Sequence, residues 1–157
     1  MDASQSLDDL VAAARENAAA HESTIANALA TEANEEEQQA AIIEIERLTV
    51  DIYSVFEARM QHHFKRGPFS RKLNALLIGA GQPDLAKRIY TYYLAVNVLK
   101  HGIGASHREL KKSPTALFDL KPFDPDNIAG SLIDVSAPGF FDGLCTTIVE
   151  AQNFLER

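Results

Sequence analysis

The stretch from residue 83 to residue 110, PDLAKRIYTYYLAVNVLKHGIGASHREL, decides how the rest of the chain is arranged. Pro83 suits the first turn of a helix, because its missing N–H is not needed there. Gly102 can take the left-handed conformation that ends a helix. The stretch therefore predicts a helix of about five turns with a clear start and a clear end.

Apolar and polar side chains of this predicted helix fall on two opposite stripes. The first is apolar and predicts the core side of the helix: Ile89, Tyr92, Tyr93, Val96, Leu99 and Ile103. The opposite stripe is mixed: Lys87, Tyr90, Leu94, Asn97 and His101. Residues four apart are neighbours on a helix, so the Asn97 amide and the His101 imidazole form the candidate catalytic pair.

Two members of the mixed stripe, Tyr90 and Leu94, would leave an apolar patch in water. A second copy of the chain can cover such a patch with the same surface. The sequence therefore predicts a homodimer whose interface contains Tyr90 and Leu94.

The composition fits one domain of an ordinary globular protein, with 157 residues, 46 % apolar content and 24 % charged residues. The single Cys145 excludes an internal disulfide and is expected to be a buried thiol, which fits a reducing compartment. No signal-like segment stands at the N-terminus, and no apolar run approaches the roughly 18 residues that span a bilayer. We expect a cytoplasmic protein with no membrane partner.

The net charge of −7 argues against a general nucleic-acid binder, but the charge is segregated along the chain. Residues 1–64 carry a net −10, residues 65–112 a net +8 and residues 113–157 a net −5. The basic block, residues 65–112, can hold phosphates of an RNA or nucleotide. Alternatively, it faces the acidic N-terminal segment within the fold or across a dimer.

The segments before the central helix are also predicted to be helical. Residues 4–31 are rich in alanine with a thin apolar stripe, which indicates a peripheral arm (residues 1–33) or an oligomer contact. A second helix should run from Asn34 to about Phe64, because its acidic start complements the helix dipole. Ser70 is expected to cap a short third helix.

Ser106 and Glu109, three residues apart, have the form of a capping box and predict a helical turn over residues 107–112. This turn places positive charge near His101. The predicted substrate-binding residues are Lys100, His107, Arg108, Lys111 and Lys112.

Residues 113–137 are predicted to be a long connection, with one extended piece at residues 132–135. Ser136 is expected to cap a closing helix that starts at Pro138.

Neither a metal nor a cofactor is predicted. His62 and His63 are adjacent and point about 100° apart on a helix, which is poor geometry for one metal ion. No Walker pattern, nucleophile elbow or glycine-rich phosphate loop occurs in the sequence.

The elements NVLKHG and RELKK, followed by a long loop and the closing segment FFDGLCTTIVEAQNFLER, resemble the HEPN superfamily of small helical bundles. The resemblance implies an all-α fold, a four- to five-helix up-down bundle over residues 34–157. The family motif is an arginine, often followed by a polar residue, with a histidine four to six positions beyond the arginine. Asn97 and His101 match the polar residue and the histidine, whereas Val96 stands in the place of the arginine.

Many members with this motif are metal-independent endoribonucleases that act as dimers. Cleavage by 2′-hydroxyl attack needs an acid or base near neutral pH, which the resemblance assigns to His101. It also needs a cation for the phosphate oxygens, where Lys100 or Arg108 would replace the missing arginine less well than a guanidinium aimed from the same helix. His107 is a further possible substitute, and a cap of its own helix is the structural alternative for His101.

The leading interpretation is a HEPN-like homodimer that binds RNA or a protein partner with weak catalysis or none. The alternative is a metal-independent endoribonuclease of a toxin–antitoxin or abortive-infection system. A structural helical bundle with no nucleic-acid role is the third class.

Overall fold

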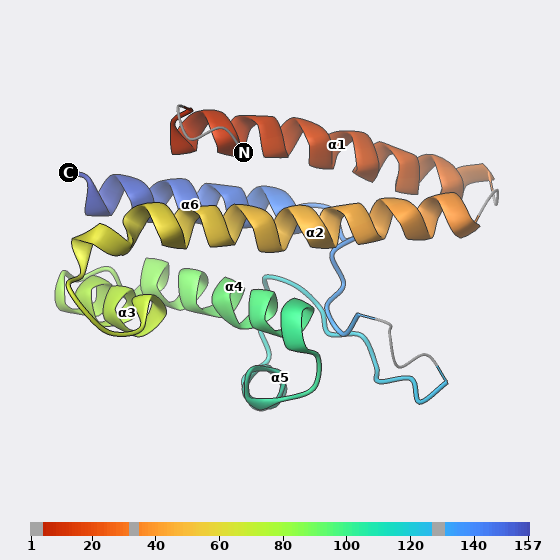
Figure 1. The fold of residues 1–157 in the computed structure, drawn as a ribbon. Coiled ribbons are helices and arrows are strands. Elements are labelled where there is room, and N and C mark those ends of the chain that lie inside the picture. Colours follow the sequence, from red (N-terminus) through yellow and green to blue (C-terminus); the bar gives the residue numbers. More distant parts are fainter. Residues whose placement is uncertain (1–4, 32–34, 127–130) are drawn as a thin grey trace.

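The computed structural model describes residues 5–31, 35–126 and 131–157. This part of the chain contains six α-helices and one short 3₁₀-helix, Gln61–His63 (Figure 1): α1 Leu7–Thr31, α2 Glu35–Met60, α3 Phe69–Gly79, α4 Pro83–His101, α5 Ala105–Lys112 and α6 Phe140–Leu155. The predicted all-α class is confirmed. None of these helices is both long enough and apolar enough to cross a membrane.

The four long helices α1, α2, α4 and α6 pack together, with α2 and α6 running in one direction and α1 and α4 in the other (Figure 1). α1 packs on α2 and α6, and α4 packs on the other side of the same two helices. The short helix α3 packs beside α4, and α5 lies on the far side of α4 from α1 and α2. The long helices therefore form three layers, with α2 and α6 between α1 and α4 (Figure 1).

The apolar stripe predicted on α4 is confirmed for the five residues that the structure buries wholly or in part: Ile89, Tyr92, Tyr93, Val96 and Leu99. The prediction for Ile103 is wrong, since its side chain is 56 % exposed. α4 ends at His101, and Gly102, with a φ of 71°, turns the chain away from the helix axis. The helical periodicity therefore stops before Ile103.

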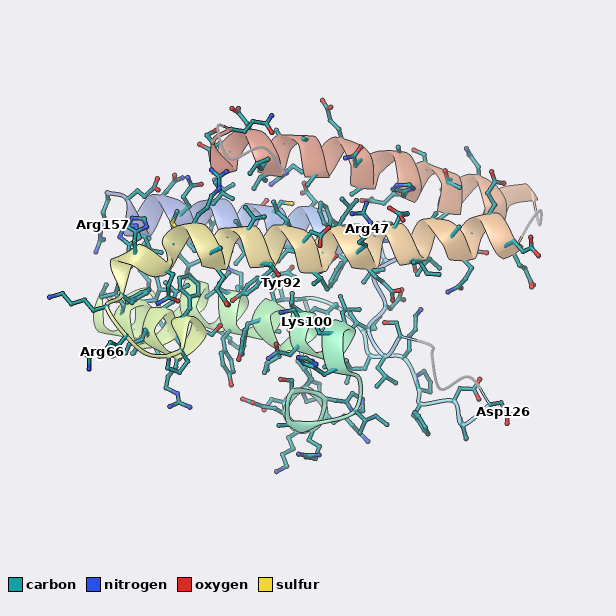
Figure 2. The ribbon with its side chains drawn as sticks, in the orientation of Figure 1. Arg47, Arg66, Tyr92, Lys100, Asp126 and Arg157 are labelled. Atoms are coloured by element: carbon teal, nitrogen blue, oxygen red, sulfur yellow. The ribbon has the colours of Figure 1, made fainter. Side chains whose placement is uncertain are left out.

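Three aromatic rings join α4 to α6 and to the connection before it. The ring centroids of Tyr92 and Phe118 lie 6.0 Å apart, those of Tyr92 and Phe140 lie 6.0 Å apart, and those of Phe118 and Phe140 lie 5.7 Å apart. Such edge and tilted contacts stabilise a core beyond the area that they bury. Figure 2 shows Tyr92 between α4 and the layer that contains α2 and α6.

The long connection is extended near the predicted position. Leu120 and Ile133 form an isolated antiparallel bridge, and residues 127–130 lie outside the described part of the chain. The cap predicted at Ser136 is wrong, because α6 begins at Phe140 after Gly139. The Ser136 hydroxyl donates instead to the Asp134 carboxylate at 2.6 Å.

α1 contributes to the common core, contrary to the expectation of a peripheral arm. Its apolar side is buried with the core residues of the other helices: Leu7, Leu10, Val11, Ala14, Ala18 and Ile25. Arg15 also donates hydrogen bonds to Asp142 and Thr146 of α6. The thin stripe suffices because small alanine side chains let the helices approach closely. The predicted boundary at residues 33 and 34 lies outside the described residues, so its position stays a prediction.

Ser70 does not cap α3. The helix begins at Phe69, directly after Pro68, and Ser70 lies in its first turn with 8 % of its surface exposed. Its hydroxyl oxygen lies 3.2 Å from the Tyr53 hydroxyl of α2. The side chain thus joins two helices instead of satisfying the start of its own.

α5 covers the mixed stripe of α4. The Asn97 amide donates to the Ser106 hydroxyl at 3.2 Å, and the Tyr90 hydroxyl donates to the Glu109 carboxylate at 2.9 Å. The predicted capping box is therefore wrong, since both of its side chains bond to α4. Leu94 lies between the two bonded residues of α4 and is only 6 % exposed. The expectation that Leu94 forms an apolar patch in water is wrong.

Candidate functional site

His101 is the last residue of α4, and its side chain is exposed. It lines a cavity of about 480 Å³ between the end of α4 and the first half of α2. The polar side chains around it are Glu46, Arg47 and Ser131. No hydrogen bond joins the His101 imidazole to its own helix in the described part of the chain, so the structure does not show the capping alternative.

The arginine in this cavity comes from α2 and was not found by sequence analysis. Arg47 donates from Nε and one terminal nitrogen to Glu44, at 3.1 and 2.8 Å, and from the other to Asp51 at 3.0 Å. The hydrogen bond to Glu44 and its charge raise the pKa of Arg47, and the same hydrogen bond lowers the pKa of the Glu44 carboxyl. Each nitrogen of the Arg47 guanidinium therefore already donates a hydrogen bond to a carboxylate. Figure 2 shows Arg47 on α2 and Lys100 near the end of α4.

The cavity beside His101 offers no unpaired arginine. Glu46 and Arg47 line it, and Arg47 is paired with Glu44 and Asp51 of the same helix. One carboxylate oxygen of Glu46 is buried without a hydrogen-bond partner among the described residues. A phosphate entering this cavity would meet carboxylates before it met a free cation.

Asn97 lines a different cavity from His101. This second cavity, of about 220 Å³, lies between α2, the start of α3 and α4, and Lys100 also lines it. Asn97 and His101 are on adjacent turns, as predicted, but they lie in the walls of separate cavities. The structure thus groups Asn97 with Lys100, and His101 with Arg47.

Val96 stands where the family motif has its arginine, and it is 1 % exposed. It belongs to the hydrophobic core. A guanidinium at this position would lose its water in the core, which is strongly unfavourable unless a carboxylate pairs with it there. α4 therefore presents no arginine beside Asn97.

The basic residues of α5 divide into two groups. Arg108, Lys111 and Lys112 are exposed, and their spacing of three and four residues puts them on one face. His107 is 7 % exposed and packs inward with Leu110. Burial first, and then the charge of Lys111, lower the pKa of His107, so it is neutral at pH 7. The prediction that His107 contacts a phosphate is therefore not supported by its position.

The basic block makes little ionic contact with the acidic segments. Among the described residues, one ion pair connects the basic block to an acidic segment: Arg88 pairs with Glu150 of α6 at 2.5 Å. None of the ion pairs between described residues joins the block to α1 or α2. Within one chain, the basic block therefore forms no ion pair with the described residues of the N-terminal acidic segment.

Within the described ranges, no group of three or more His, Cys, Asp or Glu side chains is placed to hold a metal ion. The His62 and His63 rings lie 4.1 Å apart between centroids. His62 Nδ1 donates to the backbone carbonyl of Arg59 at 2.8 Å, which leaves this ring nitrogen unavailable as a metal ligand.

Comparisons of the chain with family models, with curated proteins and with solved structures each found no match.

The buried His107 should make stability depend on pH. Its pKa in the folded chain lies below the ordinary value of 6.5, so the unfolded chain binds the proton more readily. The stabilisation is complete above pH 7 and is lost as the pH falls below about 6.5. We expect the free energy of unfolding in urea to be lower at pH 5.5 than at pH 7.5, and His107→Leu to remove part of this difference.

The matched control is His101→Leu, which changes an exposed histidine on the neighbouring helix. It should keep the full difference between the two pH values. Equal pH dependence in wild type and His107→Leu would show that His107 is not buried as described.

Proposed function

We propose that this chain is a HEPN-like helical bundle that binds RNA through the outer side of α5 and cleaves it weakly or not at all. The supporting observation is the triplet Arg108, Lys111 and Lys112. These side chains are exposed on one helix face, and among the described residues no ion pair engages them. Unpaired cations on one face are what a phosphate backbone requires.

The position of α5 supports the same proposal. It lies on the far side of α4 from the acidic helices α1 and α2 (Figure 1). Tyr90 interacts both with Glu109 of α5 and with the positive charge of Arg71 of α3, so these two helices lie close to the same residue of α4. Arg71 and Lys72 of α3 are exposed and extend the basic surface. The net charge of the whole chain does not prevent RNA binding when the charges are separated in this way.

Weak or absent catalysis follows from the separation of the motif residues. His101 lies in a cavity whose arginine, Arg47, is paired with carboxylates of α2, and Val96 is buried. A histidine can act as acid or base, but the developing phosphate charge also needs a preorganised cation. The exposed cations of α5 are not in the lining of the His101 cavity.

A cytoplasmic homodimer remains part of the proposal. Many members of the HEPN superfamily act as dimers. Leu94, however, is buried beneath α5, so it does not support the predicted interface. Leu76 and Ile78 of α3 are 45 % and 55 % exposed and point to different sides of the helix, and either is better placed than Leu94 to contact a second copy. The lone Cys145 is buried, and burial raises its pKa to about 12, which gives an unreactive thiol suited to a reducing compartment.

Replacement of Lys111 and Lys112 by glutamate should weaken RNA binding. We expect the affinity for a single-stranded RNA to fall steeply with salt in the wild type. The slope of log affinity against log salt should become shallower by about one for each phosphate that the variant no longer neutralises. Fluorescence anisotropy at several salt concentrations measures both quantities.

The control is the double variant Lys111→Arg, Lys112→Arg, which keeps both charges and should keep the slope. An affinity and a slope that are the same in the glutamate variant as in the wild type would contradict RNA binding by α5.

A second candidate function, an endoribonuclease, is favoured by one observation. Arg47 lines the same cavity as His101 and supplies a guanidinium from α2 where α4 has none. If Arg47 left Glu44 and Asp51 in the presence of RNA, it would take the place of the motif arginine.

We expect purified protein to leave structured and single-stranded RNA intact with and without EDTA, because Arg47 stays paired. Gel electrophoresis of labelled RNA checks this. Cleavage that survives EDTA and is abolished by both His101→Ala and Arg47→Ala would establish the endoribonuclease instead. Cleavage that persists in both variants would indicate a contaminating nuclease.

A further inference from the structure

A third cavity, of about 260 Å³, lies at the end of α5, next to the basic triplet. Its apolar walls are Leu110, Pro114, Phe118 and Leu120, and Lys111 also lines it. Neither the candidate pair Asn97 and His101 nor the aromatic packing of the core requires this space. Lys111 belongs both to the lining of this cavity and to the proposed RNA-binding face.

The walls of this cavity are held in place without a ligand. Phe118 is 6 % exposed and Leu110 is 2 % exposed, and both belong to the hydrophobic core. The Thr115 hydroxyl accepts a hydrogen bond from the backbone N–H of Leu117 at 3.1 Å. The Asp119 carbonyl accepts one from Asp134 at 3.0 Å. A preformed cavity of this kind binds without the cost of ordering its walls.

The polar groups of the cavity match the two parts of a nucleotide. Lys111 is exposed and supplies a cation for a phosphate, with Arg108 and Lys112 on the same helix for the neighbouring phosphates. Asp119 is exposed and supplies a carboxylate that can accept a hydrogen bond from an exocyclic amino group. The apolar walls suit the faces of a planar base.

We propose that this cavity takes one unpaired nucleobase of single-stranded RNA, while Lys111 binds the phosphate next to that base. The inference rests on the proposed function and adds the substrate class to it. A duplex keeps its bases stacked and paired, so only a single strand, a loop or an end can place a base in the cavity. The cavities beside His101 and Asn97 also have one carboxylate and one cation each in their lining, Glu46 with Arg47 and Glu57 with Lys100, but neither cavity is lined by a residue of the basic triplet on α5.

The test compares two oligomers of equal charge, an eight-residue oligocytidine and an eight-residue abasic ribose-phosphate chain. Wild-type protein should bind the oligocytidine about tenfold more tightly, because a base in an apolar or aromatic site contributes at this level. Thr115→Trp fills the cavity and should remove the preference without changing the salt slope. The control Ala116→Trp changes an exposed neighbour that does not line the cavity and should keep the preference.

The outcomes separate this inference from the function on which it rests. Salt-dependent binding of both oligomers with equal affinity by the wild type would overturn the nucleobase site and leave RNA binding in place. An equal loss of preference in Thr115→Trp and Ala116→Trp would also overturn it. Binding of neither oligomer would remove the proposed function and the inference together. The wild-type comparison decides the question even if Thr115→Trp does not fold.

Discussion

The packing of α5 across α4 determines which side chains of this protein reach the solvent. Two hydrogen bonds hold the short helix, one from Tyr90 to Glu109 and one from Asn97 to Ser106. Burial first, and then the bond to Glu109, raise the pKa of Tyr90 to about 12, which is the direction expected for a hydroxyl that donates to a carboxylate. Leu94 is buried between these bonds. The outer side of α5 therefore replaces this stripe of α4 as the solvent-exposed surface, and it is basic.

This arrangement also explains how an acidic protein can present a surface for a polyanion. The acidic helices α1 and α2 lie on one side of α4, and α5 lies on the other (Figure 1). Over the Debye length of about 8 Å at physiological salt, the exposed triplet on α5 is screened from charges on the far side of the bundle. Local charge, and not the net charge of −7, therefore governs what this face attracts.

Local features of the fold could be predicted from the sequence, because their causes are local. Pro83 and Gly102 bound α4 as expected, and the core stripe was found by its helical spacing. The failures have non-local causes. Ser106 and Glu109 had the spacing of a capping box, but their side chains found partners on α4 that no sequence window shows. Once they bonded there, Leu94 could not be exposed.

The candidate site shows the same division. The sequence predicted that Asn97 and His101 lie on adjacent turns of one helix. Their separation into two cavities depends on how α2 crosses α4. Arg47 lies 54 positions before His101 in the sequence, so its presence in the same cavity is a tertiary contact. The pairing of Arg47 with Glu44 and Asp51 could be predicted from their spacing of three and four residues on α2. The position of this arginine beside His101 could not.

The most direct measurement is the stability and molar mass of Leu94→Asp, compared with Ile103→Asp. Leu94 is 6 % exposed and Ile103 is 56 % exposed, so one aspartate is buried beneath α5 and the other is hydrated after the end of α4. We expect Leu94→Asp to lower the free energy of unfolding by about 3 kcal/mol or more, and Ile103→Asp to change it by less than about 1 kcal/mol. A Leu94→Asp protein of wild-type stability, with its molar mass halved in light scattering, would contradict the packing of α5 on α4 and restore this stripe as a dimer interface.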